Sequence, residues 1–94
     1  MKKVEVEIYS DTSNNAVMKH PGRQFPGSLI QGDSLYTLYR MIERTSDYID
    51  KNKYDEAQEG IDEVRELLLD RLNHYKQILK DHDIQLPFYE EKTD

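Results

Sequence analysis

The residues best suited to chemistry in this chain lie in one stretch that contains two Pro-Gly pairs around a single arginine. The pairs are Pro21-Gly22 and Pro26-Gly27, and Arg23 lies between them. Proline presets φ at the second position of a turn and glycine supplies a positive φ at the third, so two tight turns are predicted. Such turns expose backbone N–H groups, and an arginine adds planar, bidentate donors for a carboxylate or phosphate. The stretch is therefore the candidate binding surface.

Eight residues make up this candidate surface, either through a polar side chain or through a place in the turns. They are Asn14, Lys19, His20, Gly22, Arg23, Phe25, Gly27 and Asp33. A protein partner is the first expectation, as for an immunity-type or regulatory module. The alternative is capture of a small anion or nucleotide by Arg23 and the turn amides. The glycine spacing fits neither the P-loop nor the dinucleotide fingerprint.

The histidines do not indicate a metal site, and no catalytic residue is assigned. His74 and His82 are two helical turns apart on a predicted helix, which is too far for both to bind one ion directly. Three serines lie near His20, but no recognised nucleophile motif surrounds them. The chain has no cysteine, which excludes disulfides and thiolate metal sites. We therefore expect a non-enzymatic protein without a cofactor, and an enzyme that uses His20 is only a third alternative.

Composition and net charge exclude some classes of binding partner. The 94 residues carry a net charge of −6, which divides into +1 for residues 1–32 and −7 for residues 33–94. An acidic helical half repels phosphates, so binding to a nucleic-acid duplex is not expected. No apolar run is long enough for a membrane helix, and no signal-peptide core is present. A cytoplasmic protein is the resulting expectation.

Three short strands are predicted before residue 33. The first, over residues 4–9, alternates apolar and polar residues, as in a strand with one buried face. Its predicted inward-facing residues are Val4, Val6 and Ile8. A polar loop over residues 10–15 follows, and residues 16–19 and 28–31 supply the other two strands.

Two helices are predicted next, from Asp33 or Ser34 as N-cap to about residue 51, and from about residue 54 to 81. Apolar residues recur there at steps of three and four. The predicted helix–helix core is Leu38, Ile42, Ile61, Val64 and Leu68. Gly60 should mark a close approach between the helices.

These elements predict an α+β fold, in which a small antiparallel sheet of two or three N-terminal strands packs on a C-terminal antiparallel helical hairpin. A single domain over residues 1–94 is expected, with strands and Pro-Gly turns in 1–32, the hairpin in 33–83 and a tail in 84–94. The longer helix overhangs its partner, so the sheet, the tail or a second subunit must cover it. Surplus apolar residues beside its stripe, namely Leu67, Leu69 and Ile78, favour a homodimer.

Several motifs together resemble a known family. They are V-E-I-Y-S-D over residues 6–11, P-G-R-x-F-P-G over 21–27, L-I-Q-G-D-S-L over 29–35, and the closing H-Y-K and L-P-F segments at 74–76 and 86–88. With Asn14, they resemble a family of small uncharacterised bacterial proteins, a domain of unknown function. The resemblance covers nearly the whole chain and implies the order strand, glycine loop and two helices. It implies a bacterial, cytoplasmic protein and assigns no function or catalytic residue.

Overall fold

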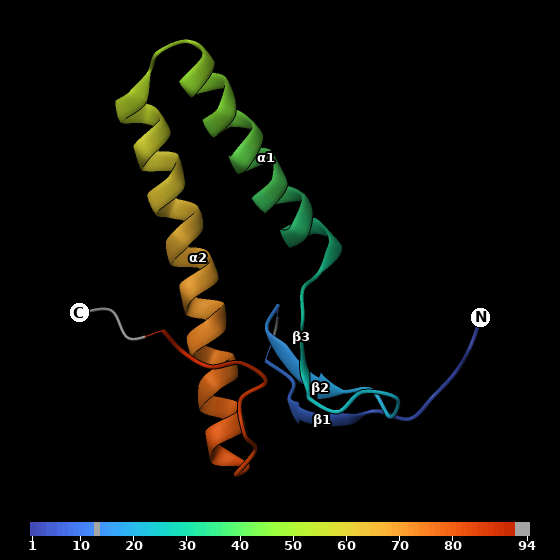
Figure 1. Cartoon of the computed structure of the whole chain (residues 1–94). Helices are drawn as coiled ribbons and strands as arrows, with labels where there is room; N and C mark the ends of the chain where they lie inside the picture. Colours follow the sequence, from blue (N-terminus) through green and yellow to red (C-terminus); the bar gives the residue numbers. More distant parts are fainter. Residues whose placement is uncertain (13, 92–94) are drawn as a thin grey trace. The chain divides into compact units, whose positions relative to one another are not determined.

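A computed structural model describes residues 1–12 and 14–91 of the chain. Its elements are β1 (Glu7–Ser10), β2 (Ala16–Lys19), β3 (Gly27–Leu29), α1 (Gly32–Asp50) and α2 (Tyr54–Asp81) (Figure 1). The strands form an antiparallel sheet in the order β1-β2-β3, and the two helices pack together after it. The predicted α+β fold with a helical hairpin is therefore confirmed. Residue 13 of the predicted loop and residues 92–94 of the predicted tail lie outside the described residues.

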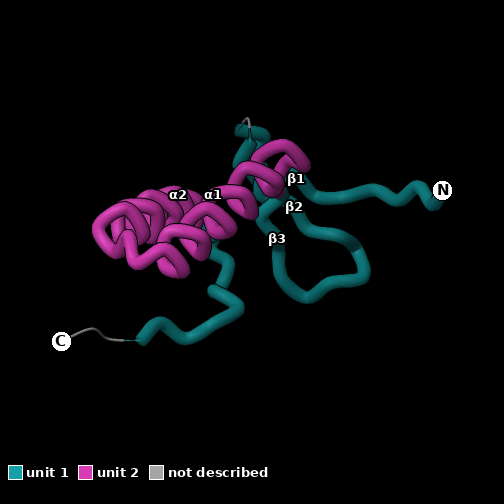
Figure 2. Tube along the Cα trace, turned by 90° about the horizontal axis from the view of Figure 1, so that it is seen from above, with its two compact units in different colours: residues 1–29, 73–94 teal, residues 30–72 magenta. Residues whose placement is uncertain are grey.

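The chain divides into two compact units, which are coloured separately in Figure 2. The first unit comprises residues 1–29 and 73–94, and the second comprises residues 30–72. Helix α2 contributes to both, because it runs without interruption from Tyr54 to Asp81. In the described part of the chain, neither helix combines the length and apolar character needed to cross a membrane.

The first unit is organised around a small core between the sheet and the C-terminal part of α2. Val17 and Leu79 are fully buried there, and Tyr75 is nearly so. The partly buried residues packed against them come from β1, α2 and the tail: Tyr9, Ile78, Ile84 and Leu86. The sheet and the tail therefore cover this end of α2, as two of the expected alternatives proposed.

The register of β1 differs from the prediction. Ile8 pairs with Met18 and Ser10 with Val17, so a β-bulge places Tyr9 as an extra residue between them. A one-residue shift exchanges the two faces of a strand. Tyr9 consequently packs against the core while Ile8 is exposed, and the prediction that Val4, Val6 and Ile8 face inward is wrong.

Both helices end with the same hydrogen-bond pattern, the Schellman motif. At the end of α1, the N–H groups of Asn52 and Lys53 donate to carbonyls of the last turn, and Asn52 has a φ of 59°. At the end of α2, Asp83 and Ile84 repeat the pattern, and Asp83 has a φ of 54°. Asn and Asp tolerate this left-handed conformation better than other non-glycine residues, which fixes where each helix stops.

Helix α1 begins slightly earlier than the sequence predicted. Gln31 is its N-cap and makes no side-chain capping bond, so the expected cap at Asp33 or Ser34 is wrong. Asp33 lies instead in the first turn, where its carboxylate accepts the N–H of Ser34 at 2.8 Å. A negative charge at this position still complements the positive end of the helix dipole.

In the second unit, α1 and α2 meet through small side chains. Thr45 and Ala57 are buried, and a Cβ atom added to Gly60 would lie 2.2 Å from Thr45 Oγ1. The predicted close approach at Gly60 is confirmed. Thr45 Oγ1 itself donates to the carbonyl of Met41 at 2.9 Å, so the hydroxyl sits in a fixed position.

The predicted helix–helix core is wrong for most of its members. Val64 is buried, but Ile42, Ile61 and Leu68 are exposed. The periodicity located an apolar stripe on each helix. The helices nevertheless contact each other through small residues, namely Thr45, Ala57 and Gly60. The larger apolar residues lie beside this contact.

We predict that Gly60→Ala destabilises the protein, although alanine has the higher helix propensity by about 1 kcal/mol. The new methyl group would collide with Thr45 Oγ1 and force the helices apart. The double variant Gly60→Ala/Thr45→Ala removes that oxygen and should recover part of the loss in urea unfolding. Equal losses in the single and double variants would contradict this account of the helix contact.

We predict that Leu79→Ala lowers the free energy of unfolding by about 2–5 kcal/mol, because it opens a cavity at a fully buried site. Leu67→Ala, on the same helix, provides the control, since Leu67 is exposed and should change stability by about 0.5 kcal/mol or less. Chemical denaturation of the two variants would measure the difference. Similar losses in both would show that the core lies elsewhere.

Candidate functional site

The loop that joins β2 to β3 carries most of the candidate surface. Its first Pro-Gly pair forms a turn, in which the N–H of Arg23 donates to the carbonyl of His20 at 3.0 Å. The N–H of Gly22 donates to His20 Nδ1 at 3.1 Å. The amide N–H groups of Gly22 and Arg23 are therefore already occupied, and the side chain of His20 helps to close the turn.

The second Pro-Gly pair does not form the predicted turn. Pro26 is buried, and Gly27 is the first residue of β3, where it pairs with Met18. None of the four glycines, all of which lie in the described part of the chain, has a positive φ, so the expectation of a left-handed glycine at residue 22 or 27 is wrong. Proline and glycine allow such a turn, but strand pairing with β2 holds Gly27 in an extended conformation instead.

A tyrosine from α2 anchors the loop. The hydroxyl of Tyr75 donates to the carbonyl of Pro26 at 2.5 Å, and both residues are buried. The two residues are 49 positions apart in the sequence. Because the ring of Tyr75 also belongs to the core of the first unit, the loop is fixed to the most buried part of that unit.

The structure places seven of the eight predicted site residues in the first unit. Asn14 precedes β2 with a φ of 61°, Lys19 ends β2 opposite Glu7, and Phe25 is half-buried. Asp33 belongs to the second unit, in the first turn of α1. The candidate surface therefore lies on the loop and the neighbouring strands of the first unit, whereas Asp33 lies in a helix of the second unit.

Arg23 and His20 are exposed side chains of the loop and belong to the candidate surface. Arg23 forms no ion pair with any carboxylate in the described residues, so its guanidinium is available. His20 accepts a hydrogen bond at Nδ1, so its neutral form carries the proton on Nε2 and presents a donor there. The loop can thus offer cationic and neutral donors to a carboxylate or a carbonyl.

A serine and a histidine that the sequence did not pair come together beside the sheet. Ser10 Oγ lies 3.2 Å from His74 Nε2, and the pair is partly buried. Within the described residues, no carboxylate contacts the other nitrogen of His74, so the orienting third member of a catalytic triad is missing. The pair joins β1 to α2 and gives no sign of nucleophilic catalysis.

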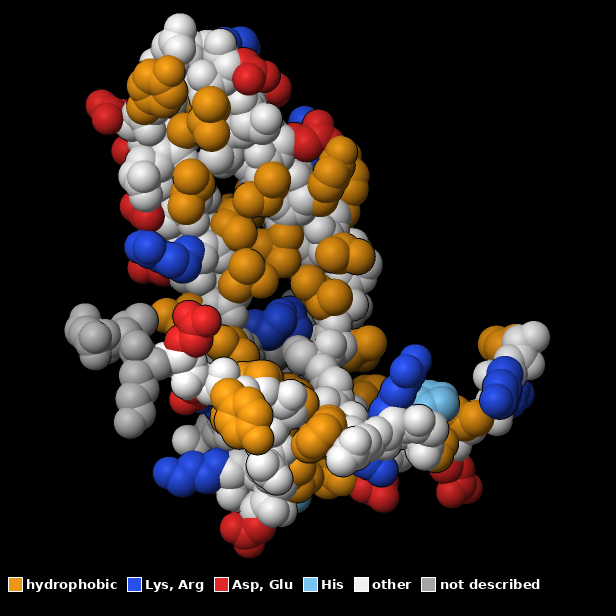
Figure 3. Space-filling view, viewed as in Figure 1, with side chains coloured by type: hydrophobic (Ala, Val, Ile, Leu, Met, Phe, Trp, Pro, Cys, Tyr) orange, Lys and Arg blue, Asp and Glu red, His pale blue; other side chains and the backbone are white. Residues whose placement is uncertain are grey.

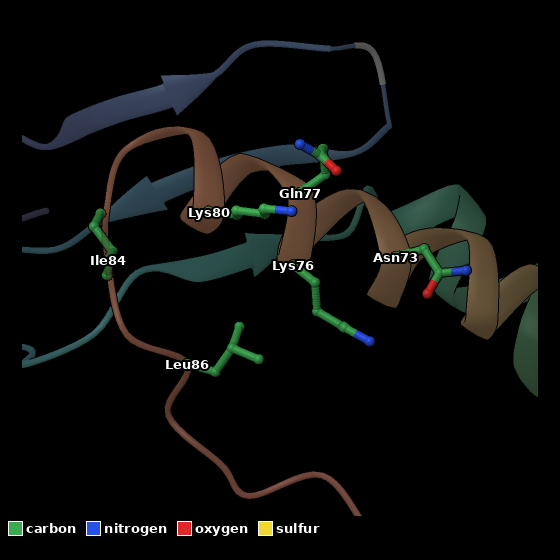
Figure 4. Close-up of a pocket in the computed structure, with 6 residues that line it drawn as sticks. All are labelled: Asn73, Lys76, Gln77, Lys80, Ile84 and Leu86. Atoms are coloured by element: carbon green, nitrogen blue, oxygen red, sulfur yellow. The ribbon is translucent and has the colours of Figure 1, made fainter.

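A pocket of about 540 Å³ lies between the C-terminal part of α2 and the tail (Figure 4). Its lining residues are Asn73, Lys76, Gln77, Lys80, Ile84 and Leu86. Lys76 forms an ion pair with Glu90 of the tail, and Gln77 donates to Asp81 at 2.7 Å. The sequence named the tail only as one of three possible covers for the longer helix. The apolar periodicity of that helix does not show where the tail lies.

Three tyrosines have a raised pKa, each for an identifiable reason. The hydroxyl of Tyr9 donates to the carboxylate of Glu7, and this bond raises the pKa of Tyr9. A hydrogen bond to Glu43 raises the pKa of Tyr39 in the same way. Burial raises the pKa of Tyr75, because its charged form would lose hydration. Of the three, Tyr75 is the one whose hydroxyl is hydrogen-bonded to the loop.

Comparison with known proteins supports the expected resemblance and adds no activity. No curated protein and no solved structure matches the chain. The model described as "Family of unknown function (DUF6959)" matches residues 1–88, which covers the sheet, the Pro-Gly loop, both helices and most of the tail. By that match, the chain belongs to the family of unknown function DUF6959.

Proposed function

We propose that this protein is a non-enzymatic binding module that engages another protein through the Pro-Gly loop, in an immunity-type or regulatory role. The observation that carries the proposal is the anchored loop, in which a closed turn presents an exposed Arg23 that forms no ion pair with the described carboxylates. The bacterial, cytoplasmic setting expected from the sequence is part of the same proposal.

The fixed geometry of the loop favours a binding role. Hydrogen bonds from the amides of the turn hold one end of the segment that carries Arg23. The hydrogen bond from the Tyr75 hydroxyl to the Pro26 carbonyl holds the other end. A segment that is ordered before binding loses less conformational entropy when a partner fixes it. Arginine is also enriched among the residues that contribute most to interfaces.

The chemistry of the loop selects the kind of partner. Arg23, Lys19 and His20 supply donors, in a region that lacks the acidic excess of residues 33–94. A partner with a surface carboxylate or exposed carbonyl groups would match them. Capture of a small anion has less support, because Gly22 and Arg23 use their amide groups within the turn.

We predict that Arg23→Ala weakens partner binding at least about tenfold, as expected for an interface arginine, and leaves the melting temperature unchanged. Quantitative affinity purification would compare the wild type, Arg23→Ala and Gln24→Ala as the matched exposed neighbour. A protein retained by the wild type and Gln24→Ala but lost with Arg23→Ala is the expected result.

Two outcomes would contradict the proposal. A lowered melting temperature for Arg23→Ala would make the arginine structural. A thermal shift of the wild type with inorganic phosphate or a nucleotide, abolished by Arg23→Ala, would favour the small-anion alternative, because a ligand raises stability by mass action.

We predict that Tyr75→Phe lowers the free energy of unfolding by about 1–3 kcal/mol, because the buried carbonyl of Pro26 loses its donor. The amide of Arg23 should also exchange faster with solvent. Tyr36→Phe, at an exposed tyrosine, is the matched control and should change neither quantity.

The effect of this substitution on stability should depend on pH. Because the pKa of Tyr75 is raised in the folded state, Tyr75 loses its hydroxyl proton in the unfolded state first as the pH rises above about 10. The contribution of Tyr75 to the free energy of unfolding is therefore complete below about pH 10 and declines above it. The difference in stability between the wild type and Tyr75→Phe should shrink over that range, and a constant difference would contradict the buried hydroxyl.

A further inference from the structure

One side of the hairpin in the second unit is an aliphatic groove of about 400 Å³. Its lining residues are Ile42, Ile61, Val64, Arg65, Leu68, Leu69 and Leu72. Every Ile and Leu among them is 41–50% exposed. Figure 3 shows hydrophobic side chains gathered over α1 and α2, consistent with this groove. Soluble monomers rarely expose a contiguous surface of this kind.

We propose that a second copy of the chain covers this groove, so that two hairpins pair face to face as a four-helix bundle with twofold symmetry. Amphipathic helices need a second layer to bury their apolar stripes, and one hairpin provides only one layer. In a pair of identical hairpins, each hairpin is the second layer for the other. This surface differs from the overhang of α2 that the sequence suggested, because Ile78 packs inside the first unit.

The spacing of the exposed residues suits such a bundle. On α1, Leu35, Ile42 and Ile49 recur every seven residues, and all three are exposed. On α2, Ile61 and Leu68 have the same spacing. A seven-residue repeat keeps apolar side chains on one face along several turns, as in left-handed bundles of helices.

The close contact at Thr45 and Gly60 explains why the aliphatic residues of the groove remain exposed. Small side chains let α1 and α2 approach until Thr45 Oγ1 fills the space beside Gly60. The large aliphatic residues beside this contact are then only half covered within the hairpin, at 41–50% exposure. Covering them from outside completes a core of the composition found in obligate homodimers.

The distribution of charge favours a second copy over a charged partner. Residues 30–72 carry six Lys and Arg against eleven Asp and Glu, a net charge of −5. Only Arg65 brings a charge to the groove, and it pairs with Asp62 on its own helix. The groove therefore offers no net charge for a basic or an acidic partner to recognise.

The acidic residues lie where pairing would leave them in water. Glu56, Glu59 and Glu63 line a separate recess together with Arg44. They occupy a different face of α2 from Ile61 and Leu68, since successive helical residues are about 100° apart. Two hairpins in face-to-face contact would keep these carboxylates on the outside of the bundle and avoid repulsion between the copies.

Sedimentation equilibrium of the full chain at concentrations on the order of 1–100 µM tests the proposal, since dimerisation follows mass action. The wild type should sediment as a dimer. Leu68→Glu places an unpaired carboxylate in the buried face and should raise the dissociation constant at least about 100-fold. Leu67→Glu is the matched control: Leu67 is 46% exposed against 50% for Leu68, but it does not line the groove, so the dimer should persist.

Three results would overturn the proposal: a monomeric wild type at every concentration, a Leu68→Glu variant that remains dimeric, or equal dissociation of both variants. Circular dichroism of each variant would verify that the helices remain folded. Leu68→Ser, a milder change at the same position, provides the readout if Leu68→Glu does not fold. It should also weaken the dimer while Leu67→Ser does not.

Discussion

The contact between Tyr75 and Pro26 is the constraint on which the first unit depends. The ring of Tyr75 packs with Val17 and Leu79, while its hydroxyl satisfies a buried carbonyl in the loop. One side chain thus joins the core to the candidate binding surface. The contact holds one end of the loop, and the turn at His20 together with the pairing of β2 with β3 holds the rest. Arg23 therefore lies on an ordered segment.

Helix α2 serves two different purposes along its length. Up to Leu72 it forms a hairpin with α1, where small residues permit close approach and leave an aliphatic groove. From Asn73 onward it supports the sheet and the tail. The left-handed conformation of Asp83 then ends the helix and turns the chain, so that Ile84 can pack on the core.

The two surfaces differ in the interactions they can make. The Pro-Gly loop offers hydrogen-bond donors and a positive charge, which suit recognition of a polar partner. The groove offers mainly apolar area and shape, which suit a permanent contact between identical chains. A small domain has a thin core, and self-association through the groove would add buried area that one chain cannot supply.

The sequence by itself determined the helices, the order of the elements and the close approach at Gly60, because periodicity and glycine placement are local signals. It located the loop that carries Arg23 but assigned a turn to Pro26-Gly27. Only the tertiary structure decided that Gly27 extends into β3, that a bulge turns Tyr9 inward, and that Tyr75 binds Pro26. Each of these depends on a partner distant in the sequence, and no pattern of neighbouring residues encodes which distant groups will meet.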